Sequence, residues 1–510
     1  MTTLYRNAVL HAPGAPATAF VVDGDRIVWL GTGEVAADET VDLGGAWVAP
    51  AFVDAHVHTT STGLMLTGLD LHGCASVTEV LDRVAHAARA GGGRPILGTG
   101  WDETHWPDRR PPTAAELDRA SFGGVVYVSR ADVHSAVASS ALLALAGDVE
   151  HRDGLVTLDA HHTVRRIAYR TLLPSQVSDA QRTALAEAAR LGIGTVHEMS
   201  GPEVAGEADL VSLLGLGSVV DVVAYWGALG DVETPARLGI RGAGGDLFCD
   251  GSIGSHTAAF HAPYADAATT GSLHHDVDAI AAHVAACVAK GLQSGFHVIG
   301  DRAIDTVLDA YERVPGVAGG RHRLEHVEAA SPDAVRRMAA LGIVASVQPA
   351  FDAEWGGPSG MYVDRLGADR AATLNPFAAF AANGIPMAFG ADSPVTPLDP
   401  WGGVRAAVQH GTPGSGLSPR AAFLAATRGG YRAGGDDESG VLAVGAPATF
   451  AVWDAEPLPT RPTDERVAGW STDAGWSEAG LPDVTKTPDC LRTVVRGRTA
   501  WNAGDPGVGR

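Results

Sequence analysis

Residues 53–58 read VDAHVH, so two histidines, His56 and His58, flank a single apolar residue. Successive side chains of a β-strand point to opposite faces, and both imidazoles would therefore project from one face while Val57 packs behind them. Two neutral imidazoles side by side can hold a metal ion, whereas an isolated pair can equally be two core histidines satisfied by hydrogen bonds. The stretch predicts a buried strand, and the rest of the chain decides what its histidines do.

Apolar, strand-like runs alternate with alanine-rich helical stretches through the middle of the chain. This alternation is typical of a parallel sheet or barrel covered by helices. We expect eight strands and therefore an α/β fold, a (β/α)8 TIM-like barrel. The strands are expected at residues 51–58, 194–200, 220–226, 245–251, 293–301, 322–328, 343–350 and 385–393.

The two ends of the chain carry short runs of alternating apolar and polar residues broken by turns, such as AFVVDGDRIVWLG at residues 19–31. Similar runs recur near the C-terminus, and the two ends could complete one sheet. We expect a small discontinuous β-sandwich domain built from residues 1–50 and 440–510. The barrel would occupy residues 51–439 between them.

The interval between the first two expected strands, residues 59–191, is too long for one β-to-α connection. It contains strand-like segments of its own, such as PILGTG at residues 95–100. An insertion after the first strand emerges at the barrel face where active sites lie, so we expect a lid or pocket wall. A second packing layer remote from the site is the alternative.

The composition limits the partners that this protein can have. The formal net charge is −22, whereas nucleic-acid binding requires clustered Lys and Arg. The four cysteines are far apart, which argues against a zinc ribbon or a disulfide framework and fits a reducing cytoplasm. No apolar run approaches the length of a membrane span. We expect a cytoplasmic protein with a small-molecule substrate and neither nucleic-acid nor membrane partners; a homodimer is one compatible assembly.

Three further strand ends carry a polar group where a core residue would be expected: His297 in GFHVIGD, His326 in LEHVE and Asp392 in AFGADSP. Barrel enzymes gather their catalytic groups at the C-terminal ends of the strands. One such histidine would usually be a hydrogen-bonded core residue, but four histidines and an aspartate at matching ends are hard to explain in that way. Imidazole and carboxylate together suit Zn, Fe, Mn or Ni better than calcium.

The motifs AFVDAHVH, FHVIGD, RLEHVE and AFGADSP, in this order, resemble those of the amidohydrolase superfamily. The likeness is to its amidohydrolase-3 branch, which includes N-substituted formamide deformylases, and it extends to GWDETHW at residues 100–106 and DGSIGSHTA at 250–258. The resemblance implies a metal-dependent barrel hydrolase acting on carbon–nitrogen bonds other than peptide bonds. The metal ligands that it implies are His56, His58, His297, His326 and Asp392.

The resemblance also implies a divalent metal cofactor, for which zinc is the first choice, with one or two ions and one preferred. In several amidohydrolases a carboxylated lysine on the fourth strand bridges two metals, but the only lysines here are Lys290 and Lys486, neither of them on that strand. An acidic side chain would supply the remaining ligand, and Asp246, Asp250 and Glu198 are the candidates. We expect Asp250 to reach the site better than Asp246, because it lies closer to the C-terminal end of the expected strand.

Asp392 and His326 are the predicted catalytic residues. Asp392 would take the proton of the attacking water and later deliver it to the departing amine. His326 would either ligate a metal or polarise the substrate oxygen. The predicted substrate-binding residues are Trp101, Asp102, His134, Asp250 and Gln348, of which the first three rest on the family likeness.

The preferred function is hydrolysis of a linear amide-type bond, in an N-substituted formamide or a related N-acyl compound, by metal-activated water. The first alternative is a deaminase or cyclic amidohydrolase on the same scaffold. The second is a non-catalytic protein that binds a metal or a small molecule, against which the retention of Asp392 beside the histidines argues. The remaining histidines, such as His86, His151, His161 and His162, are expected on the surface.

Overall fold

The computed structural model describes residues 1–13, 17–33, 35–103, 106–130, 135–459 and 479–504. The chain forms two compact units. Unit 1 comprises Met1–His58, Leu185–Glu207 and Gly217–Arg510, and unit 2 comprises Thr59–Ala184 and Ala208–Leu216. Within the described residues, no helix combines the length and the apolarity that crossing a bilayer requires.

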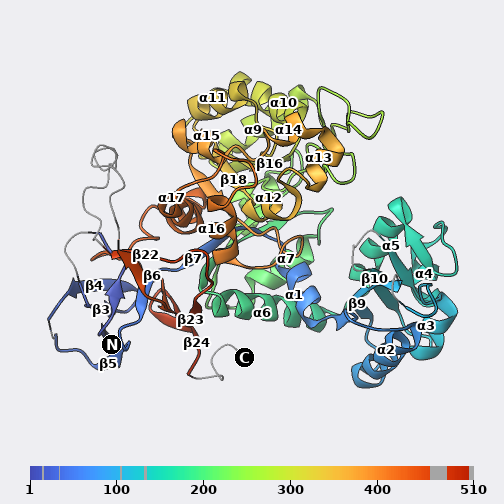
Figure 1. Cartoon of the computed structure of the whole chain (residues 1–510), viewed down its shortest axis with the longest axis horizontal. Helices are drawn as coiled ribbons and strands as arrows, with labels where there is room; N and C mark the ends of the chain where they lie inside the picture. Colours follow the sequence, from blue (N-terminus) through green and yellow to red (C-terminus); the bar gives the residue numbers. More distant parts are fainter. Residues whose placement is uncertain (14–16, 34, 104–105, 131–134, 460–478, 505–510) are drawn as a thin grey trace. The chain divides into compact units, whose positions relative to one another are not determined.

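Unit 1 contains the predicted eight-stranded parallel barrel (Figure 1). Its strands follow one another in chain order around the sheet, and every pairing between neighbours is parallel. A parallel bridge between Val57 and Ser393 brings the first strand to the end of the last and nearly closes the barrel. The strands are β7 (Phe52–Val57), β13 (Ile193–Ser200), β14 (Asp221–Trp226), β15 (Gly242–Ala243), β16 (Gln293–Val298), β17 (Arg323–His326), β18 (Val344–Val347) and β19 (Met387–Phe389).

The fourth strand differs from the prediction. It consists of Gly242–Ala243 alone, and the backbone of residues 245–251 pairs with the sheet through a single bridge between Phe248 and His297. The reason lies at Gly244, where φ is +131° and a Cβ atom would lie 2.3 Å from the carbonyl oxygen of Gly295. A residue with a side chain could not take this path. The strand therefore ends earlier than its apolar pattern suggests.

Helices cover the outside of the barrel, and some of their sequences carry clear start and stop signals. In α11 (Pro332–Leu341) the side chain of Ser331 caps the first turn, and Gly342 ends the helix in a left-handed conformation. The other helices after the second strand are α8 (Glu233–Leu238), α9 (Val277–Lys290), α10 (Asp301–Arg313), α12 (Pro349–Trp355), α13 (Met361–Leu366), α14 (Ala368–Ala371), α15 (Phe377–Ala382), α16 (Pro400–Val408), α17 (Pro419–Leu424) and α18 (Gly430–Ala433), with a π-helical turn at Ala425–Gly429.

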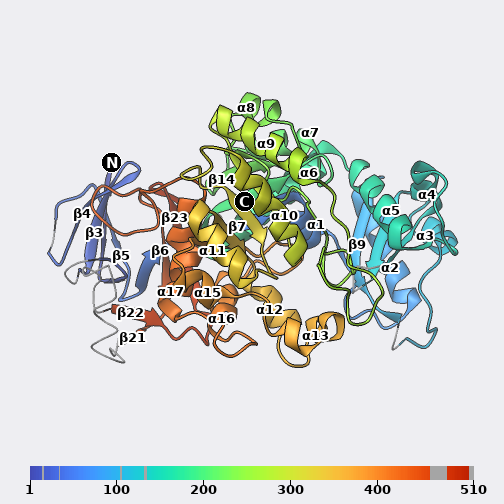
Figure 2. The ribbon, with the colours of Figure 1, turned by 90° about the horizontal axis from the view of Figure 1, so that it is seen from above.

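Both chain ends build one small β-sandwich, as predicted (Figures 1 and 2). Its two sheets share a core that includes Phe20 and Val48 from the N-terminal part and Phe450 and Val494 from the C-terminal part. One sheet contains β1 (Thr2–Arg6), β3 (Ala19–Asp23), β4 (Arg26–Gly31) and β5 (Glu39–Asp42). The other contains β2 (Val9–Leu10), β6 (Trp47–Pro50), β20 (Phe450–Asp454), β23 (Asp489–Val495) and β24 (Arg498–Asn502), and β21 (Pro457–Pro459) pairs with β22 (Ala479–Pro482).

Unit 2 overlaps the segment that we interpreted as an insertion, and it has a sheet and a core of its own. Side chains such as Val80, Leu117 and Val128 are fully buried in it. Its strands, in sheet order, are β12 (Leu155–Thr157), β11 (Ser135–Ala138), β10 (Val126–Arg130), β9 (Ile96–Trp101) and β8 (Leu69–Asp70). Its helices are α1 (Thr59–Thr67), α2 (Val77–Gly91), α3 (Ala114–Ala120), α4 (Ser140–Ala146), α5 (Leu158–Arg170) and α7 (Glu207–Leu214), and α6 (Pro174–Arg190) crosses the boundary to unit 1.

Candidate metal centre

The four predicted histidines converge at the C-terminal ends of three barrel strands. His56 lies on β7 and His58 directly follows it, while His297 lies on β16 and His326 ends β17. The ring centroids are 5.5 Å apart for His56 and His58, 5.0 Å for His56 and His326, and 4.4 Å for His297 and His326. The barrel thus gathers side chains that are up to about 270 positions apart in the sequence.

The two histidines of the first strand are each held through Nδ1. Nδ1 of His56 lies 2.9 Å from a carboxylate oxygen of Glu325, and Nδ1 of His58 lies 2.9 Å from the carbonyl oxygen of Met199. Carbonyl and carboxylate oxygens only accept, so each Nδ1 carries the hydrogen and donates it. Nε2 of each ring therefore faces the interior of the site, where it can bind an ion once it has given up any proton that it holds.

His326 follows the same pattern, whereas Nδ1 of His297 has a carboxylate oxygen nearby but no hydrogen bond among the described residues. Nδ1 of His326 lies 2.8 Å from Oε1 of Gln348, and Nδ1 of His297 lies 3.3 Å from a carboxylate oxygen of Asp250. An oxygen atom therefore stands next to Nδ1 of all four imidazoles. Such outer contacts orient histidine ligands in metal sites and fix their tautomers.

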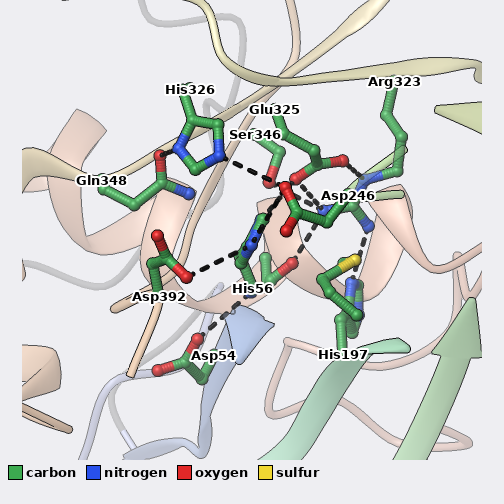
Figure 3. A network of polar contacts seen from close by, with 12 residues as sticks. Asp54, His56, His197, Asp246, Arg323, Glu325, His326, Ser346, Gln348 and Asp392 are labelled. Carbon is green, nitrogen blue, oxygen red and sulfur yellow. Dashed lines mark hydrogen bonds and ion pairs between the residues drawn. The ribbon is translucent and has the colours of Figure 1, made fainter. Parts of the chain in front are cut away.

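Two carboxylates, Asp246 and Asp392, lie beside the Nε2 atoms of the site; Figure 3 shows them with His56 and His326. Oδ1 of Asp392 lies 3.2 Å from Nε2 of His58 and 3.4 Å from Nε2 of His56. Asp246 lies 3.5 Å from Nε2 of His326, 3.6 Å from that of His58 and 3.9 Å from that of His56. Two overlapping groups could hold an ion, one formed by His56, Asp246 and His326 and the other by His56, His58 and Asp392.

Unpartnered atoms support this interpretation. Nε2 of His56 and Oδ1 of Asp392 are both buried, and neither has a hydrogen-bond partner among the residues that the structure describes. A buried polar atom without a partner is costly, and such atoms are rare unless a ligand or ion satisfies them. A divalent cation would satisfy both, so the residues present fit the metal that the sequence predicts. Both groups use Nε2 of His56, and one nitrogen binds one ion. Two ions therefore cannot occupy the two groups at the same time.

Of the two aspartates that follow the fourth strand, Asp246 and not Asp250 lies beside the Nε2 atoms. The side chain of Asp250 is 0 % exposed, which leaves no surface for the substrate contact that we predicted. It stands behind His297, and its oxygens accept three backbone hydrogen bonds at 2.8–3.0 Å. The donors are the N–H groups of Ala259, Ile299 and Gly300. The expectation that Asp250 reaches the site better was wrong because the strand ends before Asp246. Glu198, the third candidate, belongs to neither group.

The charges of the site attract cations. Burial lowers the pKa of His58, but Asp392 and Asp246 outweigh this effect and raise it to about 10. For His297 the opposing influence of Asp250 and Asp246 raises the pKa to about 9 despite burial. The imidazoles in turn keep the pKa of Asp246 and of Asp392 below the ordinary range, although burial works against it. The two carboxylates are therefore anionic at neutral pH.

Two charged residues of the site were missed in the sequence. Arg323 and Glu325 are fully buried on β17, directly before His326. Burial disfavours ionisation of Glu325, but the adjacent Arg323 and the bond to His56 lower its pKa to about 2. The sequence RLEH contained a signal for them, because Arg323 and Glu325 alternate with apolar Leu324 in a strand that was expected to be buried. Charged side chains in a buried strand require partners.

The backbone is unusual at the site. His326 and Asp392 have φ values of 68° and 54°, in a left-handed region that residues with a side chain rarely adopt and that recurs at functional sites. A Cβ atom at Gly390 would lie 2.4 Å from the backbone nitrogen of His56, so only glycine allows the last strand to approach the first this closely. Asp54 links the same two strands, because its carboxylate accepts from the backbone N–H groups of His56 and Ala391 at 3.1 Å.

The remaining substrate-side predictions fall in unit 2. Trp101 is buried in the core of that unit, and its indole N–H donates to the carbonyl oxygen of Val128 at 2.9 Å. Asp102 forms an ion pair of 2.9 Å with Arg130. His134 lies outside the described residues. A substrate contact by these side chains stays a prediction.

One expectation about the other histidines was wrong. His161 is buried in unit 2, where Nε2 lies 2.7 Å from the hydroxyl group of Tyr127. His161 lies on the buried side of the amphipathic helix α5, and the sequence analysis did not take this helical pattern into account. His86 and His151 are exposed, as expected, and the side chain of His162 is not among those described.

The sequence profile of the Amidohydrolase family matches residues 39–500. Protein LONG AFTER FAR-RED 3 of Arabidopsis thaliana is 29 % identical over 421 residues, which is 72 % of this chain and 70 % of the plant protein. The N-substituted formamide deformylase of Arthrobacter pascens is 24 % identical over 88 % of this chain and 92 % of its own length. The crystal structure of an uncharacterized metal-dependent hydrolase from Pyrococcus furiosus has a TM-score of 0.77 and 27 % identity over 89 % of this chain and 98 % of that one.

Proposed function

Because this chain belongs to the amidohydrolase family, we propose that it hydrolyses an amide-type carbon–nitrogen bond at the centre formed by His56, His58, His326, Asp246 and Asp392. One observation carries the proposal. His56, His58 and His326 each have an oxygen hydrogen-bonded to Nδ1, so their Nε2 atoms are left for the interior of the site, where two anionic carboxylates face them. This is the arrangement that a hydrolytic metal ion requires.

We propose one zinc ion for this centre, because imidazole and carboxylate groups are common zinc ligands. His297 and His326 would serve a second ion if one binds. When bound, a divalent ion supplies a Lewis acid that polarises a carbonyl oxygen and lowers the pKa of a water molecule. The cysteines of the chain are all free, which supports a reducing cytoplasm as the compartment.

Asp392 is the proposed general base and acid. Its Oδ1 atom is buried and has no hydrogen-bond partner among the described residues, and its pKa below the ordinary range keeps it deprotonated at neutral pH. It can therefore accept a proton from the attacking water and return that proton to the departing amine.

Gln348 is proposed to bind the substrate oxygen. Its Oε1 atom accepts a hydrogen bond from Nδ1 of His326, so its amide nitrogen points away from that ring. This nitrogen is buried and has no hydrogen-bond partner among the described residues. A buried N–H donor of this kind can hydrogen-bond the carbonyl oxygen of an amide as negative charge develops on it.

The proposed substrate class is an N-substituted formamide or a related N-acyl compound. The relative from Arthrobacter pascens that matches most of this chain carries that activity in its name. Deamination or ring opening of a heterocycle is the competing function, because the same ligands serve both reactions.

A product assay separates these functions. The zinc-loaded protein is incubated with an N-alkyl formamide, an N-acetyl amine, a cyclic imide and an aminated heterocycle. Release of a free amine with the matching acid supports the proposal, whereas ammonia release or ring opening supports the alternative. No turnover on any of the four, in protein that retains its metal, would support a binding role. Asp392→Asn serves as the inactive control in each case.

A further inference from the structure

Arg323 and Glu325 form a buried charged pair inside the barrel. They are two residues apart on β17 and therefore share a face of the strand, and both side chains are 0 % exposed. One nitrogen of Arg323 donates to Oε2 of Glu325 at 3.0 Å, and Nε donates to Oε1. Apolar residues of similar volume often stabilise a protein as well as such a pair does, so stability alone is a weak reason for it.

Besides its bonds to Arg323, Glu325 contacts His56, a proposed metal ligand. Its Oε2 atom accepts the hydrogen of His56 Nδ1 at 2.9 Å (Figure 3). This bond fixes which nitrogen of His56 carries the hydrogen, and Nε2 then faces Asp392 at 3.4 Å and Asp246 at 3.9 Å. His56 is the one residue that both candidate ion-binding groups share.

Arg323 fixes Glu325 to the barrel framework. Its guanidinium donates to the carbonyl oxygen of Ala55 and to the hydroxyl oxygen of Ser346, both at 2.7 Å, and to Nδ1 of His197 at 3.0 Å. These partners belong to β7, β18 and β13, so one side chain connects three other strands. A planar guanidinium with this many bonds has little freedom to turn.

We propose that Arg323 and Glu325 are positioning residues for the metal centre: Glu325 holds His56 in the orientation and tautomer that binds the ion, and Arg323 holds Glu325. The inference rests on the proposed metal-dependent function. The other three histidines are held differently, by a backbone carbonyl, by a glutamine and by Asp250, which lies 3.3 Å away. Of the four, only His56 is held by a carboxylate that an arginine neutralises.

A matched pair of double variants tests the proposal. Arg323→Met/Glu325→Gln and Arg323→Met/Glu325→Leu both remove the two charges, and they differ in whether an oxygen remains to accept from His56. Zn²⁺ affinity is measured by competition with a chelator, and the visible spectrum of the Co²⁺-loaded protein reports the ligand geometry. Circular dichroism and thermal unfolding establish that each full-length variant is folded.

The Leu variant is expected to bind Zn²⁺ about 10- to 100-fold more weakly than the Gln variant and to show an altered Co²⁺ spectrum, as loss of an outer contact to a histidine ligand does. Equal affinities and equal spectra would overturn the positioning role. If the Leu variant does not fold, Glu325→Gln is compared with Glu325→Asp, whose shorter side chain cannot reach His56. Equal affinity in that pair overturns the role as well. Wild-type protein that binds neither ion would overturn the metal centre itself, and the positioning role with it.

Discussion

Replacing Asp246 with asparagine is expected to weaken Zn²⁺ binding at least about a hundredfold while the fold is kept. The substitution preserves the size of the side chain and removes its charge. That charge lies 3.5–3.9 Å from the Nε2 atoms of His326, His58 and His56, which makes Asp246 the carboxylate that approaches most of the proposed nitrogen ligands.

The magnitude follows from the electrostatics at those distances. Two unit charges about 4 Å apart interact by about 4 kcal/mol at an effective dielectric constant of about 20. A divalent cation at the site carries two positive charges, and the amide oxygen of asparagine recovers only part of its attraction to the carboxylate. A net loss of about 3 kcal/mol corresponds to about a hundredfold in Kd.

The assay is a chelator competition with the metal-free protein, with metal content measured by elemental analysis. Asp250→Asn is the matched control, because there the same change turns one of two oxygens that accept backbone hydrogen bonds into an NH2 group, and the charge that it removes does not face the Nε2 atoms. It should cost about 1–3 kcal/mol of stability and affect the affinity less. Wild-type affinity in Asp246→Asn, or an equal loss in Asp250→Asn, would refute the assignment of Asp246.

Three further predictions concern the same centre. His56→Ala should lose bound metal and activity together, while His86→Ala, at an exposed position, should keep both; full metal content in the first variant would contradict the assignment. At full metal occupancy, Asp392→Asn should lower kcat by about a hundredfold or more, and a near-normal kcat would exclude it as the general base. Metal uptake near pH 7 should release protons, measurable by calorimetry in two buffers. The reason is that carboxylates raise the pKa of His58 to about 10 despite burial, so this proposed ligand holds a proton that the ion displaces. An affinity independent of pH below about 10 would disagree.

The positions of the histidines could be predicted because their environment is local. His56 and His58 lie in an apolar run that can only be a buried strand, and His297, His326 and Asp392 follow the same rule at later strand ends. In a parallel barrel these ends meet, so the pattern of the sequence was sufficient to bring the side chains together.

The fourth strand and the buried charges could not be predicted in this way. The run of residues 245–251 alternates like a strand, but the close approach of Gly244 to the backbone of Gly295 ends the strand at Ala243, three residues before Asp246. This contact joins residues about 50 positions apart, and periodicity does not report it. Likewise, Arg323 and Glu325 acquire their partners from three other strands, so their roles depend on the closed barrel.

The most direct test of the metal centre is a crystal structure of the Zn²⁺-loaded protein with anomalous diffraction measured at the zinc edge. We predict a peak within bonding distance of Nε2 of His56 and of an oxygen of Asp246 or Asp392, with Nδ1 of His56 still bonded to Glu325. A peak elsewhere in the molecule, or coordination of the ion through Nδ1 of His56, would contradict the account.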